Sequence, residues 1–170
     1  MHINWNDLIG QGWTIFEHSS LEFGQSEFHK AGVGETKKQA FRTDHIQWLS
    51  GGETEVICFL DQMKNTIREE MRLPIQSWEA HWASYERGGG YAPHVDQIKG
   101  RSERLLSLVG YFNKDWCAGD GGELCIHQGE NKITIAPKHG TWVLFDSNSI
   151  VHEVLPTQVL RRSLACWFRR

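Results

Sequence analysis

The feature that most constrains the fold is a succession of short β-rich segments and turns from about residue 77 onward. Glycine-rich and polar stretches such as ERGGG, CAGDGG, QGEN and PKHG separate these segments. Several short strands at regular spacing indicate a β-sandwich or a β-barrel. The expected strands are SWEAHWASY (77–85), RLLSLVGYF (104–112), GELCIHQ (122–128), KITIAP (132–137), TWVLFDS (141–147), IVHEVLP (150–156) and RRSLACWF (161–168).

The N-terminal part has helical rather than alternating patterning. Residues 53–72 predict a helix, because their apolar side chains recur at helical spacing and Pro74 follows them. Those apolar residues are Val56, Phe59, Leu60, Met63, Ile67 and Met71. A second, weaker helix is expected near 20–31, where Gly24 interrupts it. We therefore expect one domain over 1–170, with a helical support region (1–76) and a β-core (77–170).

Composition excludes several classes of function. The apolar runs are far shorter than the ~20 residues of a membrane span, and the N-terminus lacks the pattern of a secretory signal. The four cysteines (Cys58, Cys117, Cys125 and Cys166) form no CxxC pair, which indicates reduced thiols. A net charge of −3 gives no basic field for nucleic acid. We expect a cytoplasmic protein with no membrane or nucleic-acid partner.

The stretch YAPHVDQ (91–97) carries two possible metal ligands, His94 and Asp96. At the start of a strand, residues two apart share one face, so these side chains should project together. Two ligands bind weakly, and a third is needed. Outside the N-terminal part and the PKHG turn, the remaining histidines are His45, His81, His127 and His152. His152 is favoured because an apolar strand has little reason to bury an imidazole that binds nothing. Two histidines and a carboxylate form the facial triad that leaves open positions on Fe(II).

The segment RRSLACWF adds a possible anion anchor. On a strand, one face would carry Arg161, Ser163, Ala165 and Trp167. The other face would carry Arg162, Leu164, Cys166 and Phe168. A guanidinium binds carboxylates through two parallel hydrogen bonds. One arginine facing a metal-containing cavity would suit an anionic cosubstrate, whereas two inward arginines would be costly.

Six stretches between about residues 40 and 168 resemble one family: FRTDHIQWL, YERGGGYAPHVDQ, YFNKDW, GGELCI, IAPKHGTWVLFDS and HEVLPTQVLRRSLACWF. The chain resembles the Fe(II)- and 2-oxoglutarate-dependent dioxygenases, and among them the hypoxia-factor type of prolyl hydroxylase and its bacterial counterparts. This resemblance implies an α+β, mainly β fold, with a double-stranded β-helix (jelly-roll, cupin-like) core and N-terminal helices packed on one sheet. Relative to that family, the N-terminal region looks abbreviated.

The resemblance also implies residue roles. His94, Asp96 and His152 would bind iron, while Arg161, preferred to Arg162, and Tyr111 would bind the distal carboxylate of 2-oxoglutarate. The matching pocket-lining positions are Tyr85, Val109, Leu124, Val154 and Trp167. On the substrate side the matching residues are Arg104, Asp44, which would hold Arg104, and Tyr91. His81 is expected in or behind the pocket, without binding the metal.

The implied activity is hydroxylation of a prolyl residue in a protein, with the translation machinery as a candidate source of the substrate, by a monomeric enzyme. It would consume Fe(II)-activated O2 and 2-oxoglutarate, with ascorbate as a supporting reductant. The alternatives are another protein residue or a small molecule as substrate, a nucleic-acid demethylase, and a non-catalytic cupin-like metal-binding module. The demethylase motif R-x-N-x-T-x-R fails at Ser163, Ala165 and Trp167. The module would keep the three metal ligands but would not need Tyr111 with Arg161.

Overall fold

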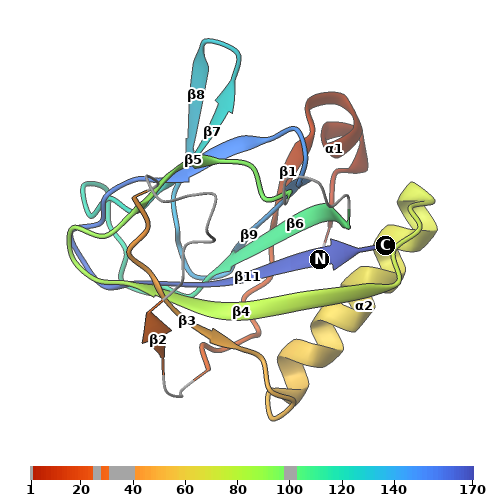
Figure 1. The fold of residues 1–170 in the computed structure, drawn as a ribbon, viewed down its shortest axis with the longest axis horizontal. Helices are drawn as coiled ribbons and strands as arrows, with labels where there is room; N and C mark the ends of the chain where they lie inside the picture. The colour runs from red at the N-terminus through yellow and green to blue at the C-terminus, as the bar shows by residue number, and fades with distance from the viewer. Residues whose placement is uncertain (1, 25–27, 31–40, 98–102) are drawn as a thin grey trace.

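Two antiparallel sheets form the body of the protein in the computed structural model, which describes residues 2–24, 28–30, 41–97 and 103–170 (Figure 1). The larger sheet has the strand order β1-β9-β6-β11-β4-β3-β2, and the smaller has the order β5-β10-β7-β8. The elements are α1 (Trp5–Gln11), β1 (Trp13–Glu17), β2 (His29–Lys30), β3 (His45–Trp48), α2 (Thr54–Met71), β4 (Ser77–Tyr85), β5 (Tyr91–His94), β6 (Arg104–Tyr111), β7 (Leu124–Gln128), β8 (Asn131–Ile135), β9 (Thr141–Asp146), β10 (Val151–Val154) and β11 (Arg161–Arg169).

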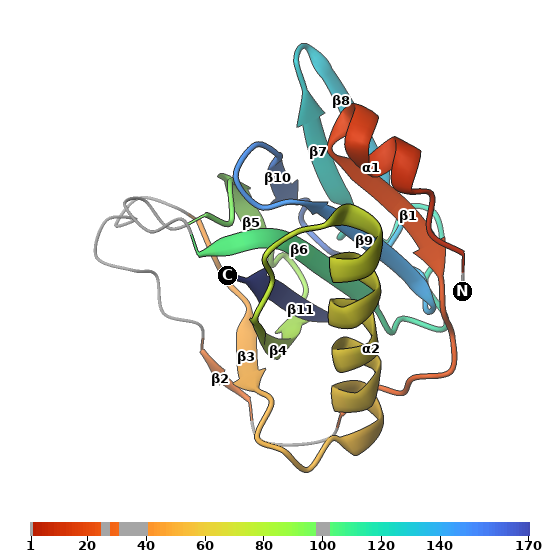
Figure 2. The same cartoon turned by 90° about the vertical axis from the view of Figure 1, so that its right-hand side faces the viewer.

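Helix α2 covers the outer face of the larger sheet, alongside β4, β11 and β6 (Figure 2). Its buried stripe is Val56, Phe59, Leu60, Met63 and Ile67, which confirms the helix predicted over 53–72. The helix ends where Arg72 adopts a left-handed φ of 54°, two residues before Pro74. None of the helices in the described ranges is long and apolar enough to span a membrane.

Strand β11 lies in the middle of the larger sheet, paired with β4 on one side and β6 on the other. Leu164, Cys166 and Phe168 are buried in the cluster that contains the α2 stripe. Arg161 faces the opposite way, since its Nε donates to the carbonyl of Gly122, just before β7. The predicted alternation along this strand is confirmed, and it places the arginine between the two sheets.

The helix predicted near 20–31 is wrong, because no described residue of that segment is helical. Leu21 is buried in the core, and Gly24 lies so close to Trp82 that a Cβ there would be 2.6 Å from the indole Nε1. The chain therefore passes closely over the sheet, where a helix would not fit. A helix forms earlier instead, at α1, which Gly12 ends with a φ of 85°.

The expected helical support region also contributes three strands to the larger sheet. Strand β1 pairs with β9, while β3 joins β2 to β4. Residues before 77 thus supply both edges of that sheet as well as its covering helix. The seven strands predicted from residue 77 onward are all present, with boundaries that differ by at most two residues.

Candidate active site

The three predicted metal ligands converge between the sheets. His94 and His152 are cross-strand partners on β5 and β10. Asp96 follows β5 in a bend, so the bend and not strand alternation brings it to the histidines. Its Oδ1 lies 3.6 Å from Nε2 of His94, and its Oδ2 lies 3.7 Å from Nε2 of His152. The donor atoms of all three residues lie within 4.8 Å of one another.

Backbone carbonyls orient both imidazoles. Nδ1 of His94 lies 2.8 Å from the carbonyl oxygen of Ala92, and Nδ1 of His152 lies 3.2 Å from that of Ile150. A carbonyl only accepts, so each Nδ1 must carry a proton in these contacts, which leaves Nε2 as the nitrogen that a metal ion would bind. This arrangement is typical of metal-binding histidines.

Ser107 holds the carboxylate of the site. Its Oγ donates to Asp96 Oδ2 over 2.7 Å and also contacts Oγ of Ser147 at 2.8 Å. Burial acts to raise the pKa of Asp96, but His152, His94 and the Ser107 hydrogen bond more than offset it and keep the pKa below its usual range. A carboxylate and two imidazoles are a donor set that fits Fe(II).

Sequence reasoning missed Ser107, although a signal for it existed. The residue shares strand parity with Val109 and Tyr111 on β6, both of which were predicted to face the pocket. A polar side chain on that face, among apolar neighbours, needs a buried hydrogen-bond partner. Asp96 is that partner.

Arg161 is almost completely buried, with 2% of its surface exposed. Its Nε donates to the Gly122 carbonyl over 2.7 Å and its Nη1 donates to Ser163 Oγ over 3.0 Å. Within the described part of the chain no carboxylate pairs with it. A buried guanidinium without a counter-ion is costly unless an anion binds there. Arg162, by contrast, is exposed, so only one arginine of the pair points inward.

Tyr111 provides a second donor beside Arg161. The guanidinium carbon lies 5.2 Å from the Tyr111 ring centre and 5.0 Å from that of Tyr85. The Tyr111 hydroxyl is buried and has no hydrogen-bond partner of normal geometry among the described residues. Burial raises the pKa of Tyr111 to about 12, although Arg161 acts in the opposite direction. The phenol therefore stays neutral and can donate, and the pair fits the distal carboxylate of 2-oxoglutarate.

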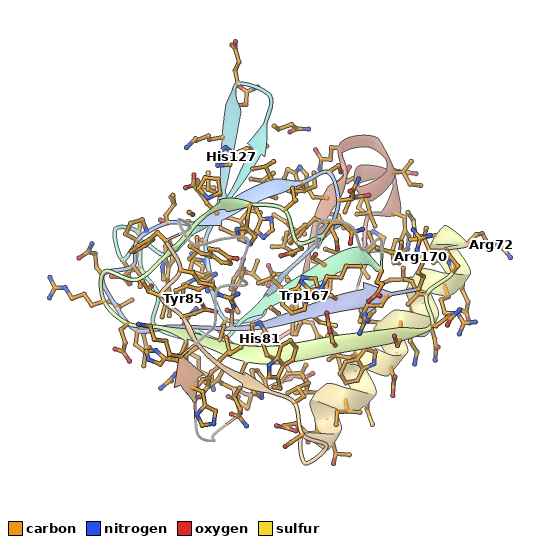
Figure 3. The ribbon with its side chains drawn as sticks, in the orientation of Figure 1. Arg72, His81, Tyr85, His127, Trp167 and Arg170 are labelled. Atoms are coloured by element: carbon orange, nitrogen blue, oxygen red, sulfur yellow. The ribbon has the colours of Figure 1, made fainter. Side chains whose placement is uncertain are left out.

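The residues predicted to line the pocket lie on facing surfaces of the two sheets. Leu124 and half-buried Val109 belong to one apolar cluster with Tyr111, and Tyr85 and Val154 belong to another. Trp167 is largely buried on β11 (Figure 3). The contact of these five side chains with a bound cosubstrate stays a prediction.

The predicted pairing of Arg104 with Asp44 is wrong. Arg104 instead bonds Glu79, at 2.6 Å, and its guanidinium carbon lies 3.8 Å from the centre of the Trp167 ring. Asp44 is buried and accepts two hydrogen bonds from Arg42, at 2.6 and 2.9 Å. The reason is placement: Asp44 precedes β3 on the far side of β4, whereas Glu79 lies across β11 from β6.

Of two further predicted residues, Tyr91 contacts a predicted metal ligand and His81 does not. The Tyr91 ring stacks on His94, with ring centres 3.7 Å apart, and Arg42 lies 4.9 Å from the Tyr91 ring centre. His81 is buried against Trp48 and contacts the Trp82 carbonyl through Nδ1. It does not join the three ligands.

Comparison with known proteins agrees with this geometry. The model of the 2OG-Fe(II) oxygenase superfamily matches residues 80–169, which is more than half of the chain. The protein therefore belongs to the 2OG-Fe(II) oxygenase superfamily. It is an Fe(II)- and 2-oxoglutarate-dependent dioxygenase of the prolyl-hydroxylase-like kind, and its cofactors are Fe(II), 2-oxoglutarate and O2.

Solved structures share the fold over most of the chain. A Pseudomonas putida prolyl-4-hydroxylase is 29% identical, with a TM-score of 0.84 over 97% of this chain and 96% of that one. That coverage confirms the jelly-roll architecture, and it contradicts the expectation of an abbreviated N-terminal region relative to this structure.

Two more distant structures show the same fold. A Trichoplax adhaerens prolyl hydroxylase, in complex with a peptide fragment of a hypoxia inducible factor, is 23% identical, with a TM-score of 0.80 over 96% of this chain and 86% of that one. A collagen prolyl hydroxylase of Paramecium Bursaria Chlorella virus-1 is 24% identical, with a TM-score of 0.61 over 75% and 79% of the two chains.

Proposed function

We propose that the protein hydroxylates a prolyl residue of a protein or peptide, consuming O2 and 2-oxoglutarate and releasing succinate and CO2. The observation that carries the proposal is the combination of the convergent triad with the buried, carboxylate-free Arg161. The likeness to the Pseudomonas putida prolyl-4-hydroxylase over nearly the full lengths of both chains supports prolyl specificity. The prolyl hydroxylase from Trichoplax adhaerens, solved with a peptide, supports a peptide-like substrate.

The chain's own residues would divide the work of the site. His94, Asp96 and His152 would hold Fe(II), which activates O2 together with 2-oxoglutarate when bound. Arg161 and Tyr111 would fix the far carboxylate of 2-oxoglutarate by charge-assisted hydrogen bonds.

The apolar walls of the cavity would protect the reaction. Val109, Leu124 and Val154 would exclude water from the reacting centre. Ser107 would keep Asp96 in a single orientation, as partners of metal-binding carboxylates do. Tyr91 and Arg104 would lie on the side from which the substrate approaches.

Arg161 and its neighbour Arg162 offer a matched test of the cosubstrate site. Arg161→Gln should weaken 2-oxoglutarate binding by about 10- to 100-fold, because a hydrogen bond to a charged group contributes about 1.5–3 kcal/mol. Arg162→Gln, on an exposed side chain, should leave the affinity unchanged. Anaerobic calorimetry with Mn(II)-loaded protein measures both. Equal affinities of the two variants for 2-oxoglutarate would show that Arg161 does not bind the cosubstrate.

The substrate requires a separate experiment. Candidate proteins from cells with and without the enzyme, beginning with the translation machinery, would be compared by mass spectrometry for a one-oxygen increase on proline. We expect an enzyme-dependent increase on a proline in a flexible loop. Absence of any such difference, while 2-oxoglutarate binding remains intact, would contradict prolyl hydroxylation but not the cosubstrate site.

A further inference from the structure

A second group of metal-capable side chains lies on the outer face of the smaller sheet. Cys125 and His127 are two residues apart on β7 and share one face. Glu153 stands directly opposite Cys125 on the neighbouring strand β10. Figure 3 shows His127 at the β7–β8 hairpin, away from Tyr85 and Trp167. The group is therefore separate from the active site.

The three side chains already converge. One donor atom from each, the Cys125 sulfur, a His127 ring nitrogen and a Glu153 oxygen, lies within 4.8 Å of the others. Nε2 of His127 is 2.8 Å from Oε1 of Glu153. Cys125 is 1% exposed, and the other two are half-buried. The thiol thus sits at the base of a small cluster, covered by groups that bind metals.

We propose that Cys125, His127 and Glu153 form a second metal site that takes a borderline-soft divalent cation such as Zn²⁺. Thiolate, imidazole and carboxylate are the ligands that Zn²⁺ prefers, and three of them leave a fourth position for water. The thiol proton is released to solvent when the sulfur coordinates, so thiolate and carboxylate together balance the charge of the ion. Sulfur distinguishes this site from the nitrogen and oxygen donors of the triad.

Lys132 sets the affinity of this site. Its ammonium lies 3.1 Å from Oε1 of Glu153, the oxygen that His127 also contacts. Lys132 is exposed on β8, opposite His127, and its flexible side chain can withdraw into solvent. It therefore competes with a cation for Glu153, and its removal should strengthen metal binding.

The position of the site gives it a structural role. Glu153 follows the predicted iron ligand His152 on β10, and their side chains point to opposite faces of the sheet. A bound ion would cross-link β7 and β10 directly behind His152. Binding should therefore stabilise the strand that carries this predicted ligand.

Cobalt(II) provides a direct test, because a thiolate ligand gives a sulfur-to-cobalt charge-transfer band that the triad cannot produce. Titration of the full chain with enough cobalt to fill the triad as well should give this band, and Zn²⁺ should bleach it. Cys125→Ser should abolish the band. Cys117→Ser, which removes an exposed cysteine elsewhere, should leave it intact, as should Asp96→Ala in the triad.

Because Cys125→Ser could lose the band by failing to fold, variants that keep Cys125 provide a second test. Glu153→Gln and His127→Gln should each weaken cobalt binding at least tenfold, with unchanged circular dichroism, whereas Lys132→Gln should tighten it several-fold. The proposal is overturned if the unaltered protein gives no sulfur band or if the band survives Cys125→Ser. It is also overturned if Glu153→Gln and His127→Gln leave cobalt binding unchanged, since these two side chains would then form an ion pair only.

Discussion

His81 and His152 show how contacts, and not burial, separate a ligand from a core residue. The two are 3% and 5% exposed. His152 directs Nε2 toward Asp96, at 3.7 Å, and its Nδ1 contacts a backbone carbonyl. His81 instead lies edge-on to Trp48, and its contact with the Trp82 carbonyl fixes the ring. Of the two histidines, only His152 is grouped with other metal-capable side chains, namely His94 and Asp96.

This difference predicts opposite outcomes for two alanine variants. His94→Ala should abolish Mn(II) binding at the triad, because two ligands hold a divalent ion weakly. His81→Ala should bind metal nearly as well as the parent protein, although it will be less stable. Anaerobic Mn(II) binding followed by electron paramagnetic resonance measures both. Equal loss in the two variants would mean that the ligand set is wrong.

The sequence predicted the ligands better than it predicted their supports. Residue type and spacing singled out His94, Asp96 and His152, although a bend and not strand alternation brings Asp96 to the histidines. The partners of Arg104 and Asp44 depend on which strand lies beside which, and spacing does not report this. Ser107 was missed for the same reason. Its contact with Asp96 depends on the bend after β5, which places Asp96 beside Ser107 on β6.

At the scale of elements, α2 anchors the larger sheet through one buried stripe. Met63→Ala should lower the free energy of unfolding by about 2–5 kcal/mol, because the side chain is fully buried and leaves a cavity. Gln62→Ala, on the exposed face of the same helix, should change it by less than about 0.5 kcal/mol. Urea unfolding gives both values. Similar losses would show that the stripe does not bear on stability.

Prediction of the elements was most secure where the pattern was long, and it missed the short strands β2 and β3. The 18 residues of α2 carry a full apolar stripe, and β4 and β11 carry nine residues each. Strands β2 and β3 have two and four residues, too few for an alternation to stand out. The segment around Gly24 misled because its apolar residues pack on the sheet in an extended form.

For the molecule as a whole, His81 links stability to pH. Burial, together with the nearby Arg42, lowers the pKa of His81 to about 4 from an ordinary value of 6.5. Between these values the unfolded chain binds a proton that the folded protein does not, so stability falls as the pH falls. The loss from this residue should reach about 3 kcal/mol by pH 4.

A neutral substitution isolates this contribution from the other titrating groups. In His81→Gln, the free energy of unfolding should decrease less steeply as the pH falls from 6.5 to 4 than in the parent protein. Urea unfolding across this range provides the comparison. Parallel pH profiles for the two proteins would show that His81 titrates normally when folded.

The central position of β11 also has a consequence for biosynthesis. Among the described residues, β4 and β6 each pair with β11 and not with each other, and β11 follows both in the chain. Until a ribosome has synthesised β11, the two halves of the larger sheet are unconnected. Arg161, the first residue of β11, has not been added to the chain at that stage. The strand that closes the sheet delivers the arginine, so the nascent chain should gain its cosubstrate anchor and its tertiary structure in the same late step.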